Sequence, residues 1–135
     1  MRVVFDANVL IAAFAARGLC EAIFELCLAN DDIYLTREIL RDVGEKLVKK
    51  IKVPPAQALA VLALIEGNAT MVDAAEVPPS ICRDPDDLNV LGAAETAKAH
   101  YIITGDNDLP VLRAHEGTKI VKPREYWEAF SRRKK

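Results

Sequence analysis

The sequence predicts a three-layer α/β fold with a mainly parallel β-sheet. Two observations support this prediction: short apolar runs alternate along the chain with segments of helical periodicity, and Pro, Gly, Asn or Asp residues separate the two kinds of segment. With 135 residues, of which 51% are hydrophobic and 28% are charged, the chain is long and apolar enough for one domain with its own core. We expect a single domain over residues 1–131 and a short basic C-terminal tail over residues 132–135.

The first segments predict a strand, two helices and a second strand. Val3-Val4-Phe5 is a short apolar run with two β-branched residues, as expected for a buried strand. Residues 9–14 are apolar, and Asn8 can cap a short helix over them. A further helix is expected over residues 20–28, and a strand over residues 33–35 follows a turn-forming Asn-Asp-Asp triplet.

Two helices and a third strand follow in the middle of the chain. Thr36 is a favourable N-cap, and apolar residues recur after it close to the helical period. Pro54-Pro55 ends this helix, and Pro55 can occupy the first turn of the next helix, which ends near Gly67. Residues 70–72 are the third expected strand, and a proline-containing loop follows it. The apolar positions of the first of these helices are Ile39, Leu40, Val43, Leu47 and Ile51.

The C-terminal part predicts a helix, two strands and a closing helix. Asp84 can cap the first helix, with Pro85 at its first position. Residues 101–103 and 119–121 are the last two expected strands. Pro123 begins the closing helix, whose aromatic residues are expected in the core rather than in an interface. These aromatic residues are Tyr126, Trp127 and Phe130.

Net charge and cysteine content narrow the class of protein. The formal net charge of −2 does not by itself indicate nucleic-acid binding, so any such role must come from the local arrangement of charges. The three cysteines fit no zinc motif, which favours a reduced, cytoplasmic protein. The N-terminus lacks the pattern of a signal peptide, and the apolar run over residues 9–16 is too short to span a membrane. We therefore expect a cytoplasmic location and no membrane partner.

Three acids are placed to converge at one edge of the expected sheet. Asp6 directly follows the first strand, and Asp106 follows the strand over residues 101–103. Parallel strands put their carboxyl ends at the same edge, which is where ligands gather in open α/β sheets. Asp87 lies in the first turn of a helix that enters from that edge. The sequence therefore predicts a cluster of carboxylates there.

Structural roles are the alternative for several of these acids. Asp84 and Asp86 fit the start of a helix, where acids interact favourably with the helix dipole. Asp106 and the two residues after it also fit a simple turn. Asp6 is the strongest candidate, because an acid directly after a buried N-terminal strand rarely has a purely structural role. The order of the three acids along the chain is a stronger signal than any one of them.

Grouped carboxylates indicate a bound divalent cation. Two carboxylates about 5 Å apart repel each other by roughly 3 kcal/mol at an effective dielectric constant of about 20. A hard cation removes this penalty, and ligation by oxygen alone suits Mg²⁺ or Mn²⁺ in sites that act on phosphates. Zinc is not expected, because the two histidines, His100 and His115, have no partner at ligand spacing.

Three blocks of this sequence resemble the PIN-domain family. They lie at the first strand, at the start of the helix that carries Asp87, and at the strand end before Asp106, and they cover nearly the whole chain in the right order. The nearest branch comprises the VapC-like toxins of toxin–antitoxin pairs. The blocks are Val3-Val4-Phe5-Asp6-Ala7-Asn8-Val9-Leu10, Asp84-Pro85-Asp86-Asp87 with the helix to Ala97, and Ile103-Thr104-Gly105-Asp106-Asn107-Asp108-Leu109.

This resemblance implies a fold, a cofactor and a reaction. PIN domains are similar to one another in a parallel five-stranded sheet with helices on both faces. They bind Mg²⁺ or Mn²⁺ and hydrolyse phosphodiesters, usually in RNA, which leaves 5′-phosphate and 3′-hydroxyl ends. The resemblance assigns Asp6, Asp87 and Asp106 to a catalytic, metal-binding site. The positions expected to support these acids are Asn8, Thr104 and Asp108.

The fourth acid departs from the family pattern. The family usually has Glu in the helix after the second strand, and Asp42 occupies that place in this chain. Asp is shorter by one methylene, about 1.5 Å, so it would reach a metal through water. Glu38 lies one turn earlier on the same face and can substitute for it. Either acid would position water or a second ion, and either also fits a solvated surface.

The resemblance also implies a substrate and partners. RNA requires positive charge around the acids, for which Arg17, Arg37, Arg41 and Arg83 are the candidates. The alternative for each arginine is an ordinary solvated surface position. The basic run over residues 46–52 is interpreted as a solvated helix end. The expected partners are RNA, an antitoxin protein encoded beside this chain, and a second copy of the chain in a homodimer.

Three other classes stay open at this point. A phosphatase of the haloacid-dehalogenase type also has Asp after its first strand, but it needs a second Asp where this chain has Asn8. A receiver-like signalling domain needs paired early acids and a lysine after a late strand, which Lys122 matches poorly. A PIN-like protein with a degraded site would keep the fold and act as a binding or dimerisation module. Mn²⁺-dependent RNA cleavage that is lost in Asp6→Asn distinguishes the nuclease from all three.

Overall fold

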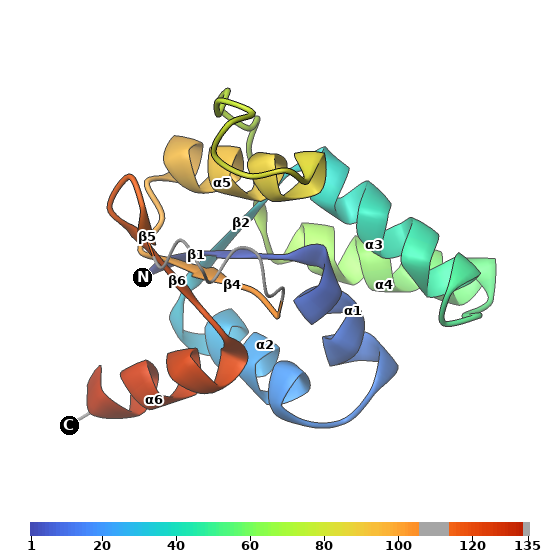
Figure 1. Ribbon diagram of the computed structural model, residues 1–135. Helices are drawn as coiled ribbons and strands as arrows, with labels where there is room; N and C mark the ends of the chain where they lie inside the picture. Colours follow the sequence, from blue (N-terminus) through green and yellow to red (C-terminus); the bar gives the residue numbers. More distant parts are fainter. Residues whose placement is uncertain (106–113, 134–135) are drawn as a thin grey trace.

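The computed structural model describes residues 1–105 and 114–133, which form six strands and six helices (Figure 1). The strands are β1 (Arg2–Phe5), β2 (Asp32–Leu35), β3 (Thr70–Met71), β4 (Tyr101–Ile103), β5 (Ala114–His115) and β6 (Thr118–Val121). The helices are α1 (Ala7–Ala15), α2 (Leu19–Asn30), α3 (Arg37–Lys49), α4 (Pro55–Gly67), α5 (Pro85–Ala97) and α6 (Pro123–Arg133). The alternation of strands and helices agrees with the pattern in the sequence.

All six strands form one sheet with the order β3-β2-β1-β4-β6-β5. The first five strands in this order are parallel, which confirms the predicted parallel unit. β5 adds an antiparallel edge to it, because a tight turn at Glu116-Gly117 pairs Ala114 with Lys119. Gly117 adopts a φ of 84°, which favours glycine at this turn. A strand of two residues is too short for a periodic pattern, so the sequence carries no signal for β5.

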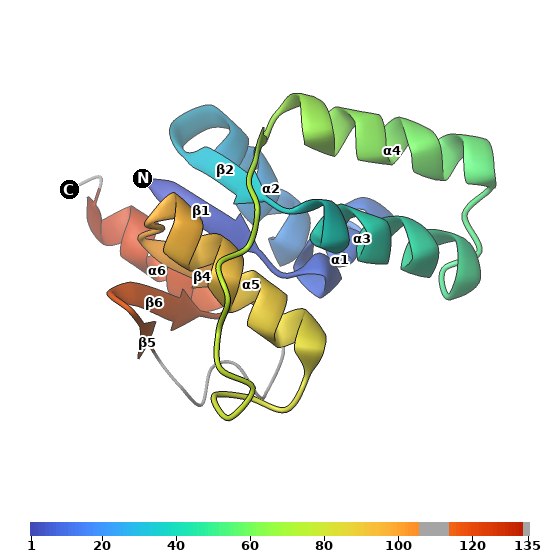
Figure 2. The same cartoon turned by 90° about the horizontal axis from the view of Figure 1, so that it is seen from above.

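Helices cover both faces of the sheet, as expected for a three-layer fold. α5 packs on β1, β2 and β4 on one face, and α2 and α6 lie over the other face (Figure 1). α1 and α3 contact each other beyond the carboxyl ends of the strands. α3 and α4 run side by side and project away from this edge of the sheet (Figure 2). The carboxyl edge is therefore framed by α1, α3 and the first turns of α5.

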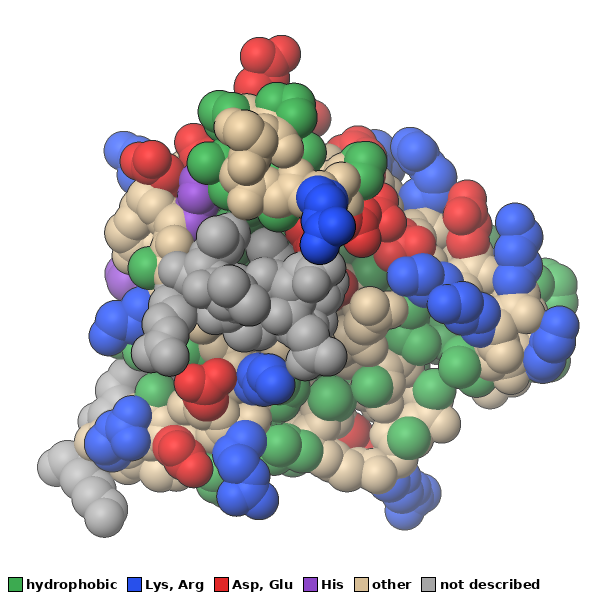
Figure 3. All heavy atoms as spheres, in the orientation of Figure 1, with side chains coloured by type: hydrophobic (Ala, Val, Ile, Leu, Met, Phe, Trp, Pro, Cys, Tyr) green, Lys and Arg blue, Asp and Glu red, His purple; other side chains and the backbone are tan. Residues whose placement is uncertain are grey.

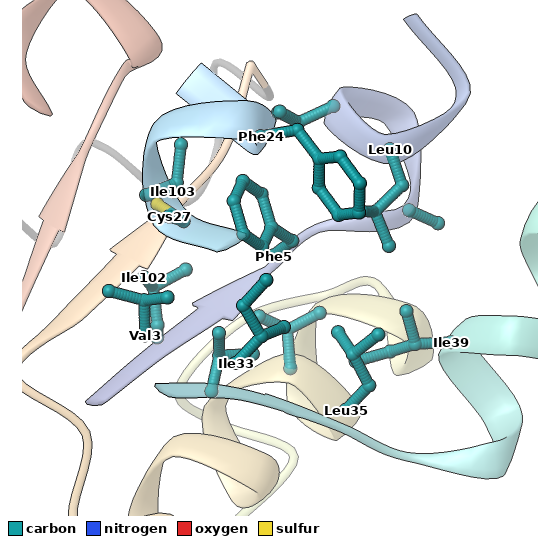
Figure 4. Packing of buried hydrophobic residues seen from close by; sticks show 14 of the residues in the cluster. Val3, Phe5, Leu10, Phe24, Cys27, Ile33, Leu35, Ile39, Ile102 and Ile103 are labelled. Carbon is teal, nitrogen blue, oxygen red and sulfur yellow. The ribbon is translucent and has the colours of Figure 1, made fainter. Parts of the chain in front are cut away.

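The core lies between the sheet and its helices (Figure 4). Val3, Val4 and Phe5 of β1 are all fully buried, because this central strand has helices on both of its faces. Phe5 packs edge-on against Phe24 of α2, with ring centroids 5.8 Å apart. Phe14 of α1 packs against the same ring at 5.3 Å. These contacts fix α1 and α2 to the strand that leads into the carboxyl edge.

The starts of α3 and α5 follow from the capping residues predicted in the sequence. The Thr36 hydroxyl accepts a hydrogen bond from the Ile39 amide at 3.1 Å, and Asp84 caps α5 with Pro85 at its first position. Both predicted caps are confirmed. Within residues 1–105 and 114–133 no helix is long and apolar enough to cross a membrane.

The start of α1 differs from the prediction. Asp6, and not Asn8, is the N-cap: its side chain accepts a hydrogen bond from the Asn8 amide, and the helix already begins at Ala7. The prediction of Asn8 as the cap was wrong because β1 passes into α1 without a loop. Asp6 is the first residue after the strand, and it has the extended backbone that an N-cap needs.

A long segment over residues 72–84 passes across α5 (Figure 2). The Ala75 amide donates to the Gly92 carbonyl at 3.0 Å, and the Thr96 hydroxyl donates to the Asp73 carbonyl at 2.7 Å. A Cβ atom on Gly92 would lie 2.2 Å from the Ala75 carbonyl oxygen. This close approach requires glycine, and it holds α5 in one position over the sheet.

α6 places two of its three aromatic residues in the core. Tyr126 is 1% exposed and Phe130 is 7% exposed, whereas Trp127 is 45% exposed. The expectation of a core position is therefore wrong for Trp127, because residues four apart share a helix face and the next residue is turned away from it. α6 continues to Arg133, so it includes the first two residues of the predicted tail.

Candidate active site

Asp6 lies at the carboxyl ends of β1 and β4. The strands are neighbours, so Asp6 after β1 meets Thr104 after β4. The Thr104 hydroxyl donates to Asp6 Oδ2 at 2.6 Å, and the Asn8 amide donates to Asp6 Oδ1 at 3.0 Å. Each carboxylate oxygen thus has a donor, and Asp6 is only 7% exposed. The three residues meet at the edge of the sheet where the sequence predicts the site.

A small pocket opens beside Asp6. The start of α1, the first half of α3 and the start of α5 line it, although they lie far apart in the sequence. In Figure 3 acidic side chains gather between the ends of these helices, with Lys and Arg side chains beside them. Four of the eight lining residues are acids, so the pocket concentrates negative charge. The lining residues are Asp6, Ala7, Glu38, Ile39, Asp42, Asp86, Asn89 and Val90.

The first turn of α5 directs Asp86 into this pocket. Asp87, the residue predicted from the sequence, is next along the helix and is buried at 4% exposure, outside the set that lines the pocket. Asp86 had been assigned to the helix start alone. Asp86, Asn89 and Val90 have the spacing of one helix face, and this spacing is the signal that identifies Asp86.

The surroundings of Asp86 disfavour its charged form. Its pKa is raised above the ordinary value, first because partial burial disfavours the charged form and then because Asp42, Asp84 and Asp6 repel it. Lys46 acts in the opposite direction. Acids from three separate elements therefore influence one another across the pocket.

Asn89 connects α5 to the start of α3. The Thr36 hydroxyl donates to Asn89 Oδ1 at 2.6 Å, and Asn89 Nδ2 donates to Glu38 Oε1 at 3.2 Å. Thr36 also caps α3, so the same hydroxyl fixes the helix start and the amide of Asn89. Glu38 is thereby held at the wall of the pocket. No sequence pattern indicated a role for Asn89.

Asp42 also lines the pocket, and it is paired with Lys46. Lys46 Nζ lies 3.2 Å from Asp42 Oδ2 and donates to Asn8 Oδ1 at 3.3 Å. The side chains of Lys46 and Asp42 are 26% and 22% exposed. The interpretation of this lysine as part of a solvated helix end is therefore wrong, because it bridges α3 and α1 beside the acids. Both candidates for the fourth acid, Asp42 and Glu38, are at the pocket.

The donor chemistry fits a hard divalent cation, since the charged groups of the pocket are carboxylates. In the part of the chain that the structure describes, no three acidic, histidine or cysteine side chains are grouped closely enough to hold a metal ion. The predicted acids Asp106 and Asp108 lie outside the described residues. The described acids thus fit Mg²⁺ or Mn²⁺ in kind and do not by themselves complete a site.

The four arginines predicted to contact RNA are all exposed, but they do not line the pocket. Arg37 and Arg41 lie on the side of α3 that faces α4, where they border a hollow with Leu62 and Glu66. The other two exposed arginines are Arg17, between α1 and α2, and Arg83, before α5.

Two solved structures share this fold. A chain in the crystal structure of VapBC2 from Rickettsia felis bound to a DNA fragment from their promoter aligns with a TM-score of 0.66 and 13% identity, over 90% of this chain and 98% of that chain. A chain in the crystal structure of DNA-bound VapBC from Salmonella typhimurium aligns with a TM-score of 0.61 and 15% identity, over 91% of this chain and 98% of that chain. At such low identities the similarity establishes a common fold.

Sequence comparison defines the family. No curated protein sequence matches this chain. A family model described as a PIN domain matches residues 2–108, which is most of the chain and includes Asp6, Asp42 and Asp86. This protein therefore belongs to the PIN-domain family.

Proposed function

We propose that this protein is a divalent-metal-dependent endoribonuclease and the toxin of a toxin–antitoxin pair. The observation that supports this most strongly is the pocket at the carboxyl edge of the sheet, where Asp6 at the start of α1 and acids of α3 and α5 converge. PIN domains are generally nucleases, and the chain belongs to that family. Converging carboxylates are the usual ligands of the divalent ions that assist phosphodiester hydrolysis.

The proposed ligands of Mg²⁺ or Mn²⁺ are Asp6, Asp87 and Asp106. Asp86 is added as a further candidate, because it lines the pocket. When bound, the ion supplies charge neutralisation at the phosphate and activation of water. In this proposal Asp42 or Glu38 orients the attacking water or a second ion.

The residues around Asp6 are proposed to keep its carboxylate in a fixed orientation. The hydrogen bonds from the Thr104 hydroxyl and the Asn8 amide restrict its rotation before any ligand binds. A carboxylate that is already oriented costs less reorganisation during the reaction. By the resemblance to the family, Asp108 has a supporting role of the same kind.

RNA is the proposed substrate, held through its backbone rather than through a base code. The exposed arginines Arg17, Arg37, Arg41 and Arg83 are the proposed contacts. The two similar structures are VapBC complexes bound to DNA, which supports an antitoxin of the VapB type as the partner of this chain. A homodimer is proposed as the state in which the chain meets that partner.

Cleavage of single-stranded RNA by the purified chain tests the proposal. We expect cleavage with Mn²⁺ or Mg²⁺, fragments with 5′-phosphate ends, and no cleavage in EDTA. Asp6→Asn should abolish the activity. Glu95→Gln at the opposite edge of the sheet is the control and should retain it. A folded wild-type chain that cleaves no RNA with either ion would contradict the proposal.

A binding module with a degraded site is the second candidate function. The observation that favours it is the ion pair between Lys46 and Asp42, which neutralises the acid that replaces the usual Glu. In this case calorimetry would detect Mn²⁺ uptake without turnover of RNA. Binding of the antitoxin would be retained in Asp6→Asn, because the role would not depend on hydrolysis.

A further inference from the structure

Lys46 lies beside the acidic pocket on the same face of α3 as two of its acids. Glu38, Asp42 and Lys46 are four residues apart, which places them one turn after another along the helix. The ammonium of Lys46 reaches Asp42 Oδ2 at 3.2 Å and, across the gap between helices, Asn8 Oδ1 of α1 at 3.3 Å. Lys46 thus contacts the pocket acid Asp42 and also Asn8, whose amide donates to the pocket acid Asp6.

The surroundings of Lys46 differ from those of an ordinary surface lysine. An exposed ion pair between residues four apart on a helix stabilises it only slightly, because solvent screens it. Here both partners are mostly covered, at 26% and 22% exposure, and the pair borders a pocket with three further acids. The charge of Lys46 also acts on Asp86, which belongs to α5. Its electrostatic influence therefore reaches an acid on the α5 side of the pocket.

An anionic substrate that enters this pocket meets repulsion from the acids. The net charge of the chain is −2, so attraction of a phosphodiester must come from local cations. Arg37 and Arg41 lie on the α4 side of α3 and do not line the pocket. Lys46 is a compact cation already directed towards the acids, and lysine binds phosphate as a point charge.

We propose that Lys46 is a substrate-binding residue of this site, with a phosphate of the RNA backbone next to the cleaved bond as its ligand. Without metal, its ammonium partly neutralises Asp42. Its ammonium would become available for the phosphate once the charge of Asp42 is neutralised by a divalent cation. This inference depends on the nuclease function proposed above.

Metal binding without substrate gives the first test. Isothermal titration of Mn²⁺ into Lys46→Met should show binding about fivefold tighter than in the wild type, because a competing cation has been removed. Lys49→Met is the matched control, because Lys49 is exposed on the same helix and borders a hollow on the α4 side. Its Mn²⁺ affinity should equal that of the wild type. Unchanged Mn²⁺ affinity in Lys46→Met would overturn the proposal.

RNA binding gives the second test. A labelled single-stranded RNA is titrated in Ca²⁺ at increasing salt. Lys46→Met should bind about fivefold more weakly, and its salt dependence should be shallower by about 0.7, the slope that one phosphate contact contributes on a single strand. Lys46→Arg should keep most of the affinity, and Lys49→Met should behave as the wild type. If Lys46→Met binds RNA as the wild type does, the proposal is overturned.

The outcomes distinguish this proposal from the nuclease function itself. If the wild type cleaves RNA and Lys46→Met matches it in either titration, the inference fails alone. If the wild type binds Mn²⁺ and RNA with the expected effects of Lys46 but cleaves nothing, the nuclease function fails and the binding role stands. A wild type that binds no RNA overturns both. Should Lys46→Met unfold, Lys46→Gln and Lys46→Arg decide by the same two titrations.

Discussion

The charged groups at the amino ends and at the carboxyl ends of the strands have different surroundings. At the amino edge, polar groups meet partners of complementary character: His115 Nε2 lies 2.7 Å from Glu95 Oε2, and Arg2 Nε donates to the Lys98 carbonyl at 3.0 Å. At the carboxyl edge, four acids line one pocket, and partial burial together with repulsion from Asp42, Asp84 and Asp6 raises the pKa of Asp86. Complementary pairing stabilises a fold. Accumulated like charge costs stability, and it is expected where a ligand brings the opposite charge.

Each of these two edges has a buried threonine, so the two edges can be compared by mutating equivalent residues. Thr118 at the amino edge donates to the Ala99 carbonyl at 2.7 Å, and Thr104 at the carboxyl edge donates to Asp6 Oδ2 at 2.6 Å. Both residues are at most 2% exposed. They differ in the acceptor: one hydroxyl binds backbone, and the other orients a carboxylate of the proposed site.

Asp6→Asn should have the largest effect on activity. Loss of a residue that only supports a metal ligand costs about 10- to 100-fold, so loss of the ligand itself should lower the RNA cleavage rate by at least about 100-fold. Asn is as good an N-cap as Asp, so the melting temperature should change little. Initial cleavage rates and thermal unfolding measure both effects. A variant that cleaves at the wild-type rate would remove Asp6 from the site.

The two threonines should separate activity from stability. Thr104→Val should lower the cleavage rate about 10- to 100-fold, because Asp6 loses the donor that orients it. Thr118→Val should cleave as the wild type does. Each variant should lose about 1 kcal/mol or more of unfolding free energy, because a buried acceptor loses its donor. Equal cleavage rates in the two variants would show that the edges do not differ as proposed.

Glu95→Ala should affect the stability of the fold and leave the activity unchanged. It removes the partner of His115 at the amino edge, where the side chains of His115 and Glu95 are 11% and 27% exposed. The expected loss is about 1 kcal/mol in the unfolding free energy measured in urea. Cleavage of RNA should be unchanged, and a large loss of activity would contradict the separation of the two edges.

Asp86→Asn should produce the smallest change in stability, a slight rise in the melting temperature near pH 7. The pKa of Asp86 is raised in the folded state, so its charged form destabilises the fold at neutral pH. This penalty disappears as the pH falls through the folded pKa towards the ordinary value of about 3.9. Thermal unfolding of the variant and the wild type from pH 7 downwards should therefore converge. A difference that grows towards low pH would contradict this account.

Much of the fold could be predicted from local patterns. Thr36 and Asp84 cap helices where the sequence places them, and the prolines at 54–55 and 123 mark helix boundaries correctly. These features depend on residues within one or two turns of each other. Ala114–His115 escaped prediction because a two-residue strand depends on its partner and not on its own pattern.

Fewer features of the candidate site could be predicted from the sequence. Parallel strand ends predict that Asp6 and Thr104 meet, because topology alone brings them together. The choice between Asp86 and Asp87 depends on the rotation of α5 about its axis, since adjacent residues differ by about 100°. That rotation is set by packing of α5 on the sheet and under the segment at Ala75, which no local pattern encodes.

Lys46 is a second residue whose surroundings could be predicted only in part from the sequence. Its pairing with Asp42 follows from a spacing of four residues, which the sequence shows. Its contact with Asn8 requires α1 and α3 to lie side by side, and this comes from the tertiary fold. The basic run therefore looked uniform in the sequence although its first member has different neighbours.

The double role of Asp6 affects how relatives of this protein should be interpreted. The residue caps α1 as well as facing the pocket, so a PIN domain without nuclease activity would still gain from an acid at that position. Its presence in another sequence is then weak evidence of an active enzyme. Asp42 does not cap a helix, so an acid at that position has no capping role that would preserve it.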